Sequence, residues 1–153
     1  MNMKPELDEK ILQIIQSCCI EQLEHKFGIT ALLEASGELP GNGIIHDRLV
    51  IAKGNDGQTN SFFCALGWEE YIENLIEMET EQQEPLNVLF ERVGNQLVED
   101  GSLLIPNLKL SQAQGRHGSF LSKKSFRIYR SIFFLRDDAK SEYCGRLTAY
   151  LIA

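Results

Sequence analysis

Two carboxylates and two amides recur along the stretch EPLNVLFERVGNQ, residues 84–96. On a helical wheel, Glu84, Asn87, Glu91 and Asn95 fall on one side, opposite an apolar set. The solvent-facing side of any half-buried helix has such a polar stripe. Asn, however, is a poor helix former that Glu, Lys or Gln would replace on a merely hydrated face. The two asparagines therefore favour a second use, as a site, and the residue types alone do not choose between the two Glu/Asn pairs.

The element that must position the stripe is a helix over about residues 85–99. Pro85 suits its first turn, and Gly101 is a suitable end. The apolar residues that recur at helical spacing are Leu86, Leu89, Phe90, Val93 and Leu97. The stripe therefore belongs to an amphipathic helix whose other side packs on a core.

The remaining pattern is a mixture of helical and β-rich segments. Helical periodicity predicts helices over 5–27, with Gly28 as the stop, and over 67–78. The turn GNDG, residues 54–57, predicts a hairpin. The β-rich runs cover residues 29–36, 44–53, 58–66, 102–114, 124–135 and 142–153. The sequence thus predicts an α+β fold in which three helices pack on a mostly antiparallel sheet of about six strands, in one domain over 1–153.

Composition excludes several classes of function. The chain has 153 residues and a formal net charge of −7, which argues against a nucleic-acid partner. It has no apolar run long enough for a membrane span and no signal peptide, so we expect a cytoplasmic protein. The scattered histidines predict no metal site. The cysteines lack a C-x-x-C spacing and are expected to be reduced and mostly buried: Cys18, Cys19, Cys64 and Cys144.

A family resemblance covers the layout of nearly the whole chain. Thr80, Glu84, Asn87 and Pro106 are similar to the motif of the CheC/CheX/FliY chemotaxis phosphatases, [SD]-x-x-x-E-x-x-N followed later by a Pro in a strand. The order of elements resembles CheX-like members in particular. These begin with a helix that ends in a pattern like HKFGI, continue with a hairpin, an amphipathic helix and the motif helix, and close with strands.

The resemblance implies that the chain hydrolyses the aspartyl phosphate of a CheY-type response regulator. In that role Glu84 would pair with a Lys of the regulator, and Asn87 would orient the attacking water. Thr80, Glu91 and Asn95 would contact the partner. The Mg²⁺ would be held by the regulator, so the chain itself needs no cofactor.

Two other functions remain open from the sequence. The chain could be a catalytically inactive CheC-like module that binds the regulator or dimerises, or an unrelated α+β adaptor such as a secretion chaperone. Pro85 bears on this choice: a site requires that the helix begin there and still present Glu84 beside Asn87. The long apolar run LTAYLIA, residues 147–153, predicts an exposed edge strand and hence a homodimer joined through sheet edges.

Overall fold

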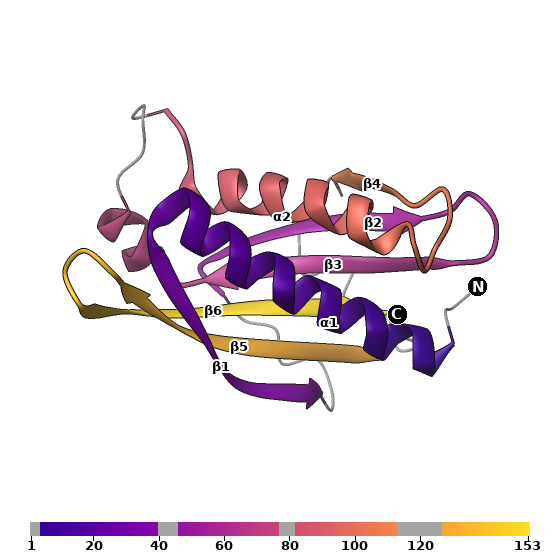
Figure 1. The fold of residues 1–153 in the computed structure, drawn as a ribbon, viewed down its shortest axis with the longest axis horizontal. Coiled ribbons are helices and arrows are strands. Elements are labelled where there is room, and N and C mark those ends of the chain that lie inside the picture. Colours follow the sequence, from indigo (N-terminus) through magenta and orange to yellow (C-terminus); the bar gives the residue numbers. More distant parts are fainter. Residues whose placement is uncertain (1–3, 40–45, 77–81, 113–126) are drawn as a thin grey trace.

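The computed structural model describes residues 4–39, 46–76, 82–112 and 127–153, and its helices and strands confirm the α+β class (Figure 1). A π-helical turn, η1, extends the first helix, and η2 is a short 3-10 helix. In chain order the elements are α1 (Pro5–Gln22), η1 (Leu23–Phe27), β1 (Ile29–Glu38), β2 (Arg48–Asn55), β3 (Ser61–Trp68), η2 (Glu70–Leu75), α2 (Pro85–Gly101), β4 (Lys109–Gln112), β5 (Ile128–Asp137) and β6 (Glu142–Ile152).

The strands form one six-stranded sheet in the order β1-β5-β6-β3-β2-β4, and every neighbouring pair is antiparallel. Helices α1 and α2 lie side by side across one face of this sheet (Figure 1). The predicted hairpin is confirmed between β2 and β3. Its turn is stabilised by Asn55 and Asp56, whose carboxamide and carboxylate oxygens accept the backbone N–H of Gly57 and Gln58 at 3.0 and 2.8 Å.

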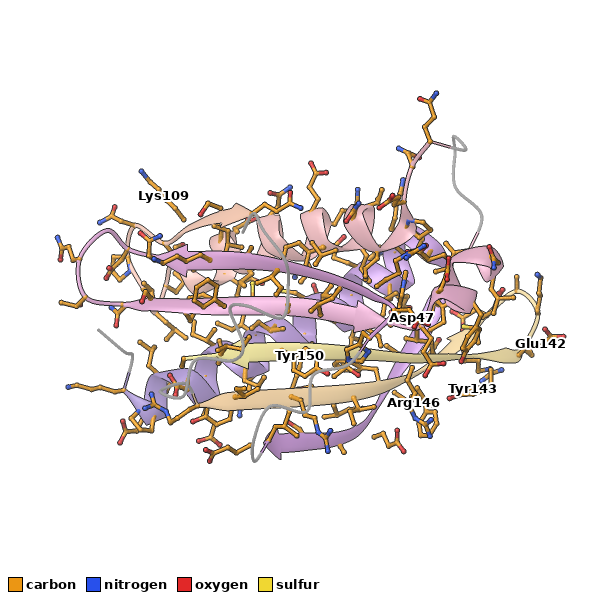
Figure 2. All side chains as sticks on the ribbon, turned by 180° about the vertical axis from the view of Figure 1, so that it is seen from behind. Asp47, Lys109, Glu142, Tyr143, Arg146 and Tyr150 are labelled. Carbon is orange, nitrogen blue, oxygen red and sulfur yellow. The ribbon has the colours of Figure 1, made fainter. Side chains whose placement is uncertain are left out.

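The final strand, β6, lies in the middle of the sheet between β5 and β3, so the prediction that it forms an exposed edge is wrong. Its side chains alternate between two apolar clusters. Leu147 and Leu151 pack beneath the helices, whereas Tyr150 and Ile152 pack on the face that the helices leave uncovered (Figure 2). The run LTAYLIA is apolar throughout because both of its faces are buried. The edge strands are β1 and β4, and the homodimer stays a prediction.

The segment after β3 differs from the predicted helix over 67–78. Trp68 still pairs with Arg48 and Leu147 in the sheet, and of the described residues 67–76 only Glu70–Leu75 is helical, as a 3-10 helix. The first backbone N–H of this 3-10 helix, that of Glu70, donates a hydrogen bond to Oδ2 of Asp47 at 3.1 Å (Asp47 is labelled in Figure 2). Tyr71, at apolar helical spacing from Trp68, is 48% exposed. The helical spacing of the apolar residues after Trp68 therefore does not mark the buried face of an α-helix.

The first turn of α1 is attached to the sheet by a buried ion pair. Asp8 is completely buried, and its Oδ2 accepts hydrogen bonds from Nε of Arg127 at 3.0 Å and from the Tyr129 hydroxyl at 3.1 Å. The second guanidinium contact, from Nη2 of Arg127, measures 2.9 Å. The pair connects a helix near the start of the chain with β5, more than a hundred residues later.

Gly28 ends the first helix, as the sequence predicts, and adopts the left-handed conformation with φ +63°. A Cβ at this position would meet nothing within 4 Å, so the cost of substitution is purely conformational. We expect Gly28→Ala to lower the free energy of unfolding by about 1 kcal/mol, measured by urea denaturation. Gly37→Ala is the control: Gly37 lies in β1 without a positive φ and with equally open space, and no loss is expected. Equal losses in both variants would contradict the explanation.

All four cysteines are buried and form no disulfide, which confirms the predicted burial; their reduced state stays a prediction. Burial raises the pKa of Cys18 and Cys64 to about 12 and raises those of Cys19 and Cys144 as well. Because only the thiolate attacks alkylating reagents, we expect no modification by iodoacetamide at neutral pH in the native chain and complete modification in urea. Mass spectrometry of the two samples checks this, and rapid alkylation of the native chain would contradict it.

Candidate functional site

Helix α2 presents the polar stripe on its outer side. Pro85 occupies its first position, where the missing N–H costs no hydrogen bond, and Glu84 is the N-cap. The predicted helix is confirmed and ends at Gly101. Of the three bulky residues that follow Asn87, Leu89 and Phe90 are buried in the core and Val88 is half-buried. The buried residues on this side of α2 are Leu86, Leu89, Phe90, Val93 and Leu97.

Glu84 and Asn87 are in direct contact at the start of α2. Nδ2 of Asn87 donates a hydrogen bond to Oε2 of Glu84 at 2.6 Å, and both side chains are exposed. Because a carboxylate only accepts hydrogen bonds, the amide nitrogen must face it. Among the described residues the amide oxygen of Asn87 has no hydrogen-bond partner, so it remains an acceptor for a ligand or a water. Glu84 therefore does not turn away from the helix. The helix begins at Pro85 and still presents Glu84 beside Asn87, as a site requires.

Glu91 and Asn95 continue the line of exposed polar residues along α2. With Asn87 they border an open groove of about 370 Å³ between α2 and the strands β2 and β4, which we call the α2–β4 groove. The side chains of Glu91 and Asn95 form no hydrogen bond with a described residue. The other residues that line the groove are Val50, Ala52, Phe90, Gly94, Val98, Leu110 and Gln112. Three of the four α2 candidates thus share one groove, and the fourth, Glu84, is bonded to the first of them.

The structure does not place the other two residues of the expected motif, Thr80 and Pro106, beside Glu84 and Asn87. Thr80 lies outside the described residues. Pro106 was expected in a strand, but it is exposed in the turns between α2 and β4, and within the described residues 102–112 the strand covers only 109–112. It follows the C-terminal end of α2, whereas Glu84 precedes the N-terminal end, and a helix of 17 residues is about 25 Å long. Pro106 therefore does not touch the Glu84–Asn87 pair.

The surroundings of Glu84 are rich in charge. Arg48 forms ion pairs with Glu70 at 2.8 Å and Glu73 at 3.4 Å. Glu70 and then Glu73 raise the pKa of Arg48, and the charge of Glu84 adds to the effect. Glu84 is therefore close to Arg48, but the guanidinium is already held by the two carboxylates of η2. One oxygen of Glu84 remains available for a cation on another molecule.

Sequence reasoning missed a polar network that joins α2 to α1. Nε of Arg92 donates to Gln22 Oε1 at 3.0 Å, and Nε2 of Gln22 donates to Gln96 Oε1 at 2.8 Å. Gln96 in turn donates to Glu21 and, at 3.3 Å, to Asp100. The side chains come from helices about 75 residues apart, so no local pattern indicates the network. It fixes the rotation of α2 about its own axis and so holds the stripe outward.

Two further observations concern the described part of the chain. None of its helices is long and apolar enough to cross a membrane. Its His, Cys, Asp and Glu side chains form no cluster of three or more that is suited to a metal ion.

Comparison with known proteins gives the fold its name. No protein-family model and no curated protein matches the sequence. Solved structures do match. The CheC-like superfamily protein from Shewanella sp. PV-4 superposes with a TM-score of 0.67 at 10% identity, over 98% of each chain. The chemotaxis protein CheX from Desulfovibrio desulfuricans superposes with a TM-score of 0.66 at 9% identity, over 93% of this chain and 97% of that one.

The chain has a CheC/CheX-like fold. The middle domain of FliM from Vibrio alginolyticus is also similar, with a TM-score of 0.56 at 10% identity over 94% of this chain and 92% of that domain. The resemblance inferred from the sequence is thus confirmed for the fold. At such low identity, a CheC/CheX-like fold establishes the architecture alone.

Proposed function

We propose that this chain binds the phosphorylated form of a CheY-type response regulator and hydrolyses its aspartyl phosphate, in chemotaxis or a related two-component pathway. One observation carries the proposal. A CheC/CheX-like fold presents an exposed Glu84–Asn87 pair, joined at 2.6 Å, at the outer start of α2. Solved structures with the same fold include chemotaxis proteins named CheX, which supports the choice of substrate, and the cytoplasmic location would follow from that of the regulator.

The proposed chemistry needs little from the chain beyond positioning. Glu84 binds a lysine of the regulator with the oxygen that Asn87 leaves available, and this contact fixes the docking. The amide oxygen of Asn87 accepts a hydrogen bond from a water and holds it in line with the phosphorus. The water's oxygen bonds to phosphorus as the bond to the aspartyl oxygen breaks, which yields inorganic phosphate and a regulator carboxylate. The Mg²⁺ that neutralises the phosphoryl oxygens belongs to the regulator.

The experiment that tests this function follows phosphate release from a phosphorylated regulator. Each CheY-type receiver domain encoded by the same genome is phosphorylated with acetyl phosphate, desalted and mixed with the chain. A faster loss of phosphate than from the regulator alone supports the proposal. An unchanged phosphate lifetime for every regulator contradicts it.

The second candidate is a binding module without catalysis. The observation that favours it is that the amide nitrogen of Asn87 is already occupied by Glu84 within the chain. A purely local pairing of side chains three residues apart would explain the same contact, since Glu84 is the N-cap and Asn87 the third residue of α2. Phosphorylation-dependent binding without faster phosphate release would select this function over the first.

A further inference from the structure

The α2–β4 groove offers an apolar floor directly beside Asn87. Phe90 and Val98 form its helix side, and Val50, Ala52 and Leu110 form its strand side. The groove follows the same side of α2 as Asn87, Glu91 and Asn95, which are spaced by four residues and so by about 6 Å each. A protein whose active site faces Asn87 must therefore lay its neighbouring surface over the groove. Its volume, about 370 Å³, has room for a large side chain and part of a second.

The described rim of the groove is negatively charged. Among the described residues that line it, Glu91 is the only charged one, and Glu84 lies just beyond its end. The nearest strand lysines belong to the opposite face of the sheet: Leu110 and Gln112 line the groove, so the alternation of β4 turns Lys109 away. Lys109 extends outward at the sheet margin in Figure 2. A partner that offers an apolar side chain with a positively charged residue beside it would be complementary to the apolar lining of the groove and to Glu91.

Gly94 sets the depth of the groove. A Cβ there would approach Cδ1 of Leu110 to 3.3 Å, so even a methyl group would tighten the contact between α2 and β4. A glycine in the middle of a helix costs up to about 1 kcal/mol relative to alanine. The groove is thus kept open at a cost in helix stability.

We propose that the α2–β4 groove receives an apolar side chain of the phosphorylated regulator, and that Glu91 pairs with a lysine or arginine beside that side chain. This inference rests on the proposed function and adds the contact that selects the regulator. Such contacts are the same before and during the reaction, so they act on KM and leave kcat unchanged. Asn87, by contrast, acts on kcat.

Two variants test the groove in the phosphate-release assay. Val98→Phe fills it, and Glu91→Lys reverses its charge. Each is expected to raise KM about tenfold while kcat stays within about twofold of the wild-type value. Glu99→Lys makes the same change of charge on α2 outside the groove, and Leu103→Phe adds an aromatic ring at an exposed position; neither is expected to change KM. Circular dichroism confirms that each variant is folded.

The outcomes separate the groove from the proposed function. If Asn87→Ala slows phosphate release while both groove variants keep the wild-type KM, the function stands and the groove inference is overturned. If the wild-type chain releases no phosphate, the same variants are compared by fluorescence anisotropy with the regulator carrying beryllofluoride, an analogue of the aspartyl phosphate. A Kd about tenfold weaker in both groove variants supports the inference, whereas unchanged Kd values, or no binding by the wild type, overturn it. A change from dimer to monomer in Val98→Phe by light scattering would assign the groove to a second copy of the chain instead.

Discussion

Asn87→Ala is expected to lower kcat for phosphate release from the regulator by about 100-fold, with KM nearly unchanged. The amide oxygen of Asn87 has no partner among the described residues and is the acceptor proposed to orient the attacking water. Losing one well-placed polar group of this kind costs about 10²-fold in rate. The fold should not suffer, because alanine is the better helix former at an exposed position.

The measurement is phosphate release at a saturating and a limiting regulator concentration, so that kcat and KM are separated. Glu84→Gln keeps an acceptor for Asn87 but removes the charge, and it is expected to raise KM more than it lowers kcat. Gln13→Ala, which removes an exposed amide from α1, is the matched control and should behave as the wild type. If Asn95→Ala loses the rate and Asn87→Ala does not, the site is the second Glu/Asn pair on α2.

Asp8→Ala is expected to lower the free energy of unfolding by about 3 kcal/mol. The carboxylate is completely buried and accepts from both Arg127 and Tyr129, so its removal takes away the acceptor that the guanidinium and the hydroxyl share. The Arg127 side chain is 32% exposed, and water relieves part of that loss. The expected value therefore lies at the lower end of what breaking a buried ion pair costs.

Urea denaturation of the wild type and the variant, with equal slopes, measures the change. Glu9→Ala is the matched control, because Glu9 is the next residue in α1 and is exposed; it is expected to change stability by less than about 0.5 kcal/mol. Oδ1 of Asp8 has no hydrogen-bond partner among the described residues, so part of the cost of burying the carboxylate is not offset there. A loss below about 1 kcal/mol in Asp8→Ala would show that this cost nearly cancels the attraction of the pair.

Local patterns in the sequence were enough to predict the long helices and the hairpin. Apolar residues at helical spacing predicted both α1 and α2, and Pro85 and Gly28 marked a start and a stop correctly. Helix geometry also makes Glu84 and Asn87 neighbours, because residues three apart lie on adjacent turns. Each of these features depends only on residues that are close together in the chain, so it can be predicted from the sequence without knowledge of the tertiary structure.

The same local rules failed where long-range packing decides. The spacing of Trp68, Tyr71 and Leu75 resembles a helix face, but the sheet extends through Trp68 because β2 and β6 pair with it there. The apolar final run was interpreted as an exposed edge, although an apolar strand is also what the centre of a sheet buried on both faces requires. The pattern of apolar residues in a strand indicates how many of its faces are buried, but it does not indicate which strands pair with it.

The sequence by itself determined the α2 stripe, the contact between its first two members and the α+β class of the fold. The tertiary structure alone decided that the stripe borders a groove. That groove exists because β4 pairs with β2 and brings Leu110 and Gln112 beside a helix that precedes them in the chain. Pairing between strands more than fifty residues apart is selected by the packing of the whole sheet, and no short stretch of residues specifies it.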